Sequence, residues 1–298
     1  MRLWVLGVVS LFVARPGWAR PHGLPDRGVF ADLDARVELA PRAPRTPVEG
    51  VIDEARGILV VYDAGLAHTA YPLGGETAVE LGGRSLALRA ADAAEVAPLL
   101  AGRPVTVRDG HSRVRGGDRD GDGIPDALDT LLGARKVALN GARYEGGYLA
   151  LPYPGGDVPR EIGVCTDVIV RAMRNAGIDL QVEIQADIAR APRAYPMVKR
   201  RDASIDHRRV KTIVPWFRRH MAKRGTDPRA AGDPFLPGDI VFFDTFPSKA
   251  GPDHVGIVSD RLGESGLPLV VNNWTEGYVE SEMDLLPIVP VTDRFRAE

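Results

Sequence analysis

The stretch of residues 163–177, GVCTDVIVRAMRNAG, constrains the fold most, because it specifies a short amphipathic helix that opens with a cysteine. Gly163 allows a tight approach to the helix, and Gly177 supplies a left-handed stop after it. We therefore expect a helix that starts at Cys165. The apolar residues that recur at helical spacing along it are Val168, Ile169, Ala172, Met173 and Ala176.

Cys165 is the only cysteine in the chain. An intramolecular disulfide is therefore excluded, and three roles remain open: a link between two copies, a small buried core residue, or a reactive thiol. At a helix start, unpaired N–H groups and the helix dipole favour negative charge, which lowers the pKa of a thiol. The position thus favours a nucleophile over a core residue.

Residues 1–19, MRLWVLGVVSLFVARPGWA, have the pattern of a secretory signal peptide. Arg2 precedes an apolar run, and the small residues Gly17 and Ala19 predict cleavage after Ala19. The run of roughly twelve apolar residues is shorter than the ~20 that a membrane-spanning helix requires. We therefore predict a secreted or periplasmic protein with no membrane span after cleavage. The formal net charge of -2 gives no reason to expect nucleic acid as a partner.

Three strand patterns follow the helix along the chain: residues 240–243 (IVFF), 254–260 (HVGIVSD) and 267–274 (LPLVVNNW). The second begins with His254, and Asn272 lies near the end of the third. A nucleophilic cysteine needs a base, and the base needs an orienting residue. This order of elements can bring a thiol, an imidazole and an amide together at one sheet edge.

The other histidines fit other roles. His220 is expected on the surface of an amphipathic helix, and His207 is expected to tether a loop or to join a polar network. The remaining three, His22, His68 and His111, precede the region of the cysteine.

The cysteine helix, PGDIVFF and HVGIVSD resemble the NlpC-like branch of the papain-like cysteine hydrolases, many of which cut peptide bonds in bacterial cell walls. The resemblance is closer to a secreted bacterial family of that superfamily that is catalogued as a domain of unknown function. It covers about residues 140–295 and implies an α+β fold, a papain-like NlpC-type domain in which the helix bearing the cysteine packs on an antiparallel sheet. The motifs that carry it are LPYPGGDVP, GVCTDVIVRA, IDHRRV, PGDIV, HVGIVSD and VVNNW.

The resemblance also implies roles for individual residues. Cys165 is the implied nucleophile, His254 the implied base and Asn272 the implied orienting residue, with Asn273 as the second choice. The backbone N–H of Cys165 is expected to hold the oxyanion, and Tyr153 in LPYPGG is the implied second donor. For Tyr153, an aromatic residue packed beside a Pro-Gly turn is the alternative.

Two positions depart from the pattern of the resembling enzymes. Relatives often have a histidine where Asn272 stands, and a small serine follows the cysteine where this chain has Thr166 and Asp167. An asparagine still orients a ring nitrogen but supplies no charge. Asp167 suits the helix dipole, yet it opposes thiolate formation if it points at the sulfur. The activation of the thiol therefore depends on the direction of the Asp167 side chain.

Residues 118–129, DRDGDGIPDALD, have the ligand spacing of a calcium loop, with Gly123 at the sharp turn. The last ligand position holds Asp instead of the usual Glu, and the loop resembles those of thrombospondin type 3 repeats and dockerins. We predict a structural calcium ion that braces a linker, and a solvated acidic turn ahead of a helix is the alternative. The predicted ligands are Asp118, Asp120, Asp122, Ile124, Asp126 and Asp129.

The N-terminal part reads as a small β-rich domain with a Pro-rich arm, and one helix from about residue 91 to 100. We therefore predict four segments: a signal peptide at 1–19, this β-rich domain at 20–115, the calcium loop and linker at 116–135, and the hydrolase domain at 140–298. The predicted strands of the N-terminal domain are residues 57–65, 68–75, 77–83 and 103–110.

Two functions remain from the sequence. The first is a secreted thiol hydrolase, an amidase or endopeptidase that cleaves amide bonds of cell-wall peptides through a Cys-His-Asn site and needs no catalytic cofactor. The second is a calcium-braced cell-wall-binding or structural protein whose papain-like domain is inactive. Acyl transfer by the same residues is not separated from hydrolysis by the sequence.

Overall fold

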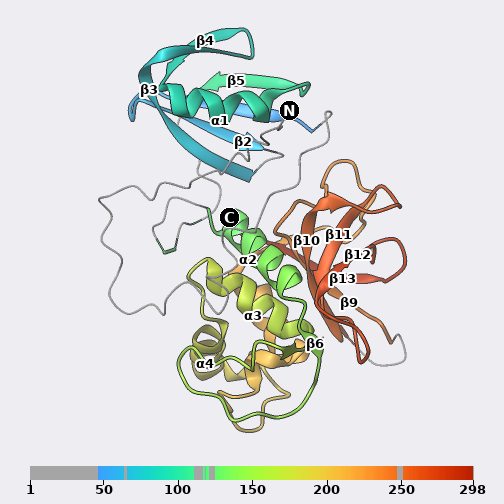
Figure 1. Ribbon diagram of the computed structural model, residues 1–298. Helices are drawn as coiled ribbons and strands as arrows, with labels where there is room; N and C mark the ends of the chain where they lie inside the picture. The colour runs from blue at the N-terminus through green and yellow to red at the C-terminus, as the bar shows by residue number, and fades with distance from the viewer. Residues whose placement is uncertain are drawn as a thin grey trace, which may run out of the picture.

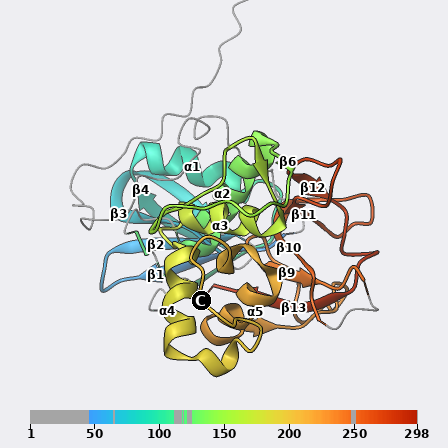
Figure 2. The same ribbon diagram turned by 90° about the horizontal axis from the view of Figure 1, so that it is seen from below.

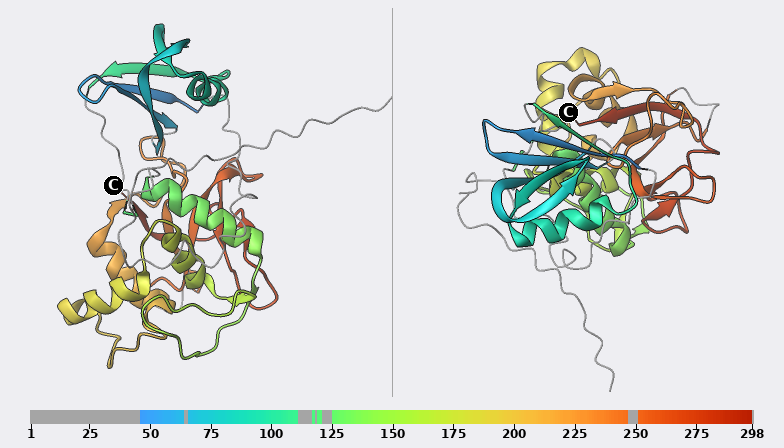
Figure 3. Two further views of the ribbon diagram at one scale, coloured as in Figure 1. Left: turned by 60° about the vertical axis from the view of Figure 1, so that its left-hand side comes forward. Right: turned by 90° about the horizontal axis from the view of Figure 1, so that it is seen from above.

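The structure is a computed structural model that describes residues 46–63, 66–110, 117, 119–120, 125–246 and 251–297. The predicted signal peptide, 1–19, lies outside these residues. The N-terminal sheet with its helix and the C-terminal unit, which Figures 1 and 3 show, have separate apolar cores. None of the helices in the described parts of the chain is long and apolar enough to cross a membrane.

The N-terminal unit is a five-stranded sheet in the order β4-β3-β2-β1-β5, covered by one helix. Neighbouring strands of the sheet pair antiparallel, except β1 and β5, which pair in parallel. Alternate strand residues and helix residues such as Val96 form its own apolar core. The elements are β1 (Val48–Asp53), β2 (Ile58–Asp63), β3 (Leu66–Leu81), β4 (Arg84–Leu88), α1 (Ala90–Leu100) and β5 (Val105–Asp109).

The strands predicted at residues 68–75 and 77–83 are one long strand, β3, which is a correction to the sequence analysis. The pairing of β3 with β4 shifts between Leu73 and Thr77, where Gly74 has a φ of 91°. At Gly75 a Cβ atom would lie 2.0 Å from the backbone carbon of Leu88. The glycines therefore bend the strand instead of ending it, because only they permit this conformation and approach.

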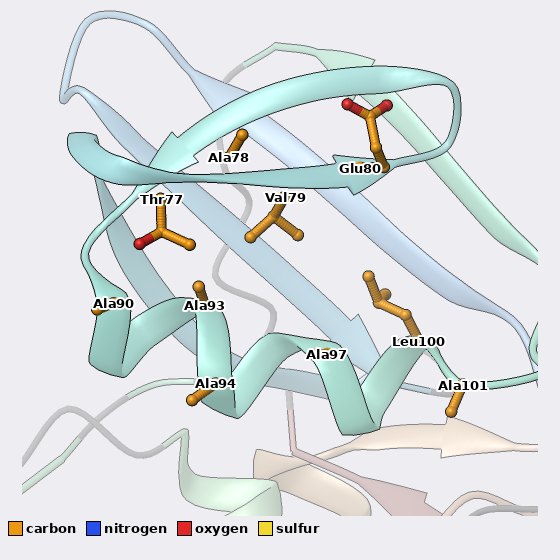
Figure 4. Close-up of a pocket in the computed structure, with 10 residues that line it drawn as sticks. All are labelled: Thr77, Ala78, Val79, Glu80, Ala90, Ala93, Ala94, Ala97, Leu100 and Ala101. Carbon is orange, nitrogen blue, oxygen red and sulfur yellow. The ribbon is translucent and has the colours of Figure 1, made fainter.

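An open groove lies between α1 and the β3–β4 hairpin (Figure 4). Small side chains leave the space: Ala93 and Ala97 face it from the helix, and Val79 faces it from the strand. Its volume is about 640 Å³. It lies within the N-terminal unit, which contains none of the predicted catalytic residues.

The C-terminal unit is built on a six-stranded antiparallel sheet in the order β12-β11-β10-β9-β13-β8. Two very short strands, β6 and β7, pair in parallel beside it. The strands are β6 (Arg143–Tyr144), β7 (Ile162–Gly163), β8 (Ala222–Arg224), β9 (Ile240–Phe243), β10 (His254–Leu262), β11 (Pro268–Asn272), β12 (Ser281–Met283) and β13 (Val291–Arg296).

Helices cover one side of this sheet, and the main apolar core lies between the two layers. Figure 2 shows α5 beside β9 and β13, where Phe217 meets Phe242 and Phe295 with ring centroids 5.4 and 5.8 Å away. The arrangement confirms the predicted α+β class. The α-helices are α2 (Asp126–Asn140), α3 (Cys165–Asn175), α4 (Leu180–Arg190) and α5 (Val210–His220), and the 3-10 turns are Pro192–Ala194 and Asp206–Arg208.

Helix α2 belongs to the C-terminal unit, so the predicted linker at 116–135 and the domain start at 140 are corrected. Ala134 and Val137 are fully buried in the same core as the α3 side chains. At Gly133 a Cβ atom would lie 2.5 Å from the carbonyl oxygen of Ala172, so the α2 and α3 backbones touch there. The two helices therefore run side by side, as Figure 1 shows.

Candidate active site

Cys165 is the first residue of α3, as the sequence predicts. The helix starts here because Val164 has an extended backbone and donates its N–H to the Asp167 carboxylate at 2.7 Å. The cysteine side chain is turned inward against the sheet, and the residue is only 7% exposed. The thiol thus combines a helix start with burial.

His254 and Asn272 lie on neighbouring antiparallel strands, β10 and β11. His254 Nε2 and Asn272 Oδ1 are 3.1 Å apart. Gly256 makes this approach possible, because a Cβ atom there would lie 3.3 Å from the Cβ of Asn272 and 2.4 Å from Val270 Cγ1. The absent side chain leaves room for the amide to reach diagonally across to the imidazole.

The hydrogen bonds of Asn272 also fix the tautomer of His254. Asn272 Nδ2 donates to the carbonyl oxygen of Val270 at 3.1 Å, so Oδ1 is the atom that faces the ring. A carbonyl oxygen only accepts, and Nε2 must therefore carry the proton. Nδ1 is left as the basic nitrogen. A neutral histidine held in this tautomer is suited to accept a proton.

The start of β10 lies beside Cys165. The backbone N–H of Val255, the residue after His254, hydrogen-bonds the Cys165 sulfur, as does that of Thr166. The structure therefore places the thiol beside the backbone of the residue that follows His254, and it places His254 itself beside Asn272. The ring of Trp274 lies edge-on to His254, with centroids 4.8 Å apart.

Burial determines the protonation states of Cys165 and His254. It raises the pKa of Cys165 to about 12, although the N–H groups of Val255 and Thr166 act against this shift. It lowers the pKa of His254 to about 4, opposed by the Asn272 hydrogen bond. At neutral pH the site therefore holds a thiol and a neutral imidazole. The rise in the pKa of Cys165 is opposite to the lowered thiol pKa expected from the helix start, and burial is its largest cause.

Asp167 does not oppose the rise in the pKa of Cys165, and its own negative charge is paired with Arg208. Arg208 donates two hydrogen bonds to the carboxylate, from Nε to Oδ1 at 2.8 Å and from Nη2 to Oδ2 at 3.0 Å. Both side chains are 2% exposed. The carboxylate still adds to the rise in the pKa of Cys165, after burial. Its main role is to cap α3 and to anchor the turn that carries Arg208.

Tyr153, the predicted second oxyanion donor, is a largely exposed side chain, and its role stays a prediction. It lies 52% exposed in a loop and precedes a cis peptide bond to Pro154. Tyr144, in β6, is the tyrosine within electrostatic range of the thiol: burial raises the pKa of Tyr144, and Cys165 adds to the rise. Both tyrosines start a Tyr-x-Gly-Gly sequence, so the motif alone did not distinguish them. Tyr144 is the functional candidate that sequence reasoning missed.

Asn273, the second choice for the orienting residue, points to the other face of β11. Its Nδ2 donates to the carbonyl oxygens of Ala142 at 3.3 Å and Gly163 at 3.0 Å. These two carbonyls precede β6 and Val164. Asn273 therefore braces the segments that lead to Tyr144 and to the cysteine, and Asn272 is the residue at the histidine.

The other described histidines lie in other surroundings. His207 is buried in the turn Asp206–Arg208, and burial lowers its pKa to about 4. His220 ends α5, where it lies 3.1 Å from the carboxylate of Asp187 and stacks on Trp216. His22, His111 and the side chain of His68 lie outside what the structure describes.

The predicted calcium loop is only partly described, because Asp118, Asp122 and Ile124 lie outside the described residues. Asp126 begins α2, and its Oδ1 accepts the backbone N–H of Arg119 at 2.9 Å. Asp129 is 1% exposed and accepts a hydrogen bond from the Asn175 side chain of α3. The described residues, which include Asp120, contain no group of three metal-ligating side chains. The calcium ion stays a prediction.

Comparison with known proteins places this unit in a family. A family model described as "Domain of unknown function (DUF1287)" matches residues 131–297, which include Cys165, His254 and Asn272. The "Uncharacterized protein YijF" of Escherichia coli (strain K12) is 40% identical over 154 residues, which are 51% of this chain and 73% of the relative. No solved structure matches the chain. The chain thus belongs to the DUF1287 family.

Proposed function

We propose that this protein is a secreted thiol hydrolase of the NlpC-like, papain-fold type, an amidase or endopeptidase that cleaves amide bonds of cell-wall peptides. One observation carries the proposal: Asn272 Oδ1 holds His254 Nε2 at 3.1 Å, at the sheet end where β10 meets the thiol of Cys165. A nucleophile, a base and an orienting residue in this relation form the arrangement of cysteine hydrolases.

The architecture supports the same proposal. The helix that starts with the nucleophile is packed on an antiparallel sheet, and the histidine and asparagine come from adjacent strands of it. This is the arrangement implied by the resemblance to NlpC-like enzymes. The signal-peptide pattern at residues 1–19 supports action outside the cytoplasm.

The reaction starts from the neutral pair. His254 Nδ1 takes the proton of Cys165 as the sulfur attacks the amide carbonyl carbon, so the thiolate forms only in the transition state. The oxyanion is held by the unpaired backbone N–H of Cys165 at the helix start and by the Tyr144 hydroxyl. His254 then returns the proton to the leaving amine, which leaves a thioester. A water molecule, deprotonated by His254, attacks the thioester, releases the acid and restores the thiol.

The alternative function is a cell-wall-binding or structural protein with an inactive site. One observation favours it: burial raises the pKa of Cys165 to about 12, so the resting thiol is unreactive. The two functions differ in whether the cysteine performs chemistry. In the alternative, a Cys165→Ala variant keeps every function of the protein and changes only its stability.

The test is amine release from cell-wall peptides by the chain from Arg20 onward. Cys165→Ala and His254→Ala are expected to abolish release, and Asn272→Ala to lower kcat about tenfold to a hundredfold, because the imidazole loses its tautomer and orientation. His220→Ala is the matched control, since this histidine ends α5 and pairs with Asp187. Release by Cys165→Ala at the wild-type rate, or no release from any peptide, would contradict the proposal.

A further inference from the structure

The side chains of the candidate active site are closed off from water. Cys165 is 7% exposed, His254 is 4% exposed and Asn272 is fully buried. An amide substrate has to bring its carbonyl carbon to the sulfur and its nitrogen within reach of the imidazole. Part of the surrounding structure therefore has to move before the proposed reaction can start.

The side of the site that carries Tyr144 is fixed by buried hydrogen bonds. Glu280 Oε2 accepts the N–H of Ala142 at 3.0 Å, and the backbone N–H of Glu280 donates to the carbonyl oxygen of Ala142 at 2.9 Å. Glu280 Oε1 accepts a hydrogen bond from Arg171 Nη1 of α3 at 2.9 Å. The two side chains of this ion pair are 0% and 1% exposed. The segment that leads to Tyr144 is thus tied to the cysteine helix, so it is a fixed wall of the site.

The turn after β11 is held far less firmly. Within the described chain, residues 274–277 make no hydrogen bond to another segment, and their turn is closed by one bond, from the N–H of Tyr278 to the carbonyl oxygen of Thr275 at 3.0 Å. An anchored residue stands on each side of them. Asn273 Nδ2 donates to two buried carbonyl oxygens at 3.0 and 3.3 Å, and the carbonyl oxygen of Tyr278 accepts the N–H of Tyr144 at 3.0 Å.

Trp274 is the residue of this turn that reaches the catalytic side chains. Its ring lies edge-on to the imidazole of His254, with centroids 4.8 Å apart. The residue is half-buried, and it packs against a small apolar cluster that includes Phe243 and Val270. Because the imidazole is almost fully buried and the indole beside it is partly exposed, the Trp274 ring stands between His254 and water.

We propose that residues 274–277 form a gate, closed by the Trp274 ring over His254, which opens to admit the substrate. The inference rests on the proposed hydrolase function and concerns how access to its site is regulated. A turn with one hydrogen bond of its own opens at a lower free-energy cost than a strand within a ladder. The anchors at Asn273 and Tyr278 keep the ends of the gate in place while the residues between them move.

The closed gate also keeps the imidazole dry and in position. Trp274 is therefore a positioning residue, which shields His254 until the substrate takes the place of the ring. Burial is the largest cause of the low pKa of His254, and the indole supplies part of that burial. The imidazole thus stays neutral and ready to accept a proton while the gate is shut.

The first test labels the thiol and needs no turnover. Cys165 is the only thiol, so the rate of its modification by fluorescein maleimide reports how often the site is open. Trp274→Ala is expected to raise this rate about tenfold or more, because the closed state loses its covering ring. Gly277→Ala leaves the ring in place and is also expected to raise the rate, because Gly277 has a φ of 88° in the closed turn and alanine is strained there.

Gly266→Ala is the matched control for the labelling. Gly266 has a φ of 76° and lies in the turn between β10 and β11, at the ends of these strands away from His254 and Asn272. It is expected to leave the labelling rate unchanged. Wild-type rates in Trp274→Ala and Gly277→Ala overturn the proposal, and so does an equal rise in both glycine variants, which indicates general loosening of the fold.

The second test follows the titration of His254 by NMR. In Trp274→Ala its pKa is expected to rise from about 4 towards the ordinary value of about 6.5, because water then reaches the ring. The Asn272 hydrogen bond and the charge of Asp253, which both raise this pKa, remain in the variant. Trp274→Phe keeps an apolar ring and is expected to keep the pKa near 4. A pKa near 4 in Trp274→Ala contradicts the covering role of the ring.

The gate and the hydrolase function fail in different ways. Faster labelling of the gate variants, without amine release from any cell-wall peptide by the wild type, refutes the hydrolase function and leaves the gate standing. Amine release by a wild type whose labelling rate and His254 titration do not depend on Trp274 refutes the gate and leaves the hydrolase function standing.

Discussion

The buried pair of Asp167 and Arg208 gives the sharpest test of how the site is built. Replacing Arg208 with methionine keeps an unbranched apolar stem and removes the guanidinium charge. Asp167 is then left uncompensated at 2% exposure, and it retains only the N–H of Val164 as a donor among its hydrogen bonds. Breaking a buried pair in this way costs about 3–5 kcal/mol of the free energy of unfolding.

Urea unfolding measures this cost directly. The chain from Arg20 onward contains only two tryptophans, Trp216 and Trp274, and both lie in the C-terminal unit. Tryptophan fluorescence therefore follows the unfolding of that unit alone. With a slope of about 2 kcal/mol per molar urea, the midpoint is expected to fall by roughly 1.5–2.5 M in Arg208→Met.

Two variants control this measurement. Arg261 forms an ion pair with Glu282 at 3.3 Å but is 50% exposed, so Arg261→Met is expected to cost less than about 1 kcal/mol. Asp167→Asn combined with Arg208→Met removes both charges and is expected to recover part of the loss. Equal midpoint shifts for Arg208→Met and Arg261→Met, or a double variant whose loss is the sum of the two single losses, would refute the reasoning.

Three further predictions follow from the site. Because burial lowers the pKa of His254 to about 4, its basic form persists in mildly acidic solution. Amide hydrolysis should stay constant from pH 7 to about 5 and fall as the pH drops through about 4, whereas a fall near pH 6.5 would contradict the buried imidazole. Tyr144→Phe should lower kcat about tenfold to a hundredfold and Tyr153→Phe should leave it unchanged, with equal effects in a kinetic assay refuting the assignment. Calcium titration by calorimetry should show binding that weakens at least tenfold in Asp126→Asn, and no heat at millimolar calcium would remove the ion from the description.

Local sequence predicts the parts of the site that depend on neighbouring residues. The apolar spacing after Cys165 predicts the start of α3, and the β-branched run after His254 predicts β10. The strand order then suffices to place His254 next to Asn272, because adjacent antiparallel strands return to the same end of a sheet. The α+β class follows from the same order of elements.

Long-range packing decides the parts that sequence reasoning missed. The pKa of Cys165 depends on how completely the sheet covers the thiol, and no pattern within residues 163–177 contains that information. Tyr144 and Tyr153 share a Tyr-x-Gly-Gly sequence, and only the pairing of β6 with β7, directly before the cysteine helix, separates them. The predicted start of the C-terminal domain at residue 140 was misplaced for a similar reason. Only the packing of α2 against α3 shows that the helix after the calcium motif belongs to the C-terminal unit.

The close approach of α2 and α3 at Gly133 determines where the chain can be divided. The family match begins at residue 131, in the middle of α2, and a fragment that starts there would lose the first turn of the helix, including Asp129 and its bond to Asn175. A fragment that starts at residue 140 would lose all of the helix but its last residue and would uncover α3 at Ala172, where Gly133 packs against it. The smallest autonomous fragment therefore begins before Asp126.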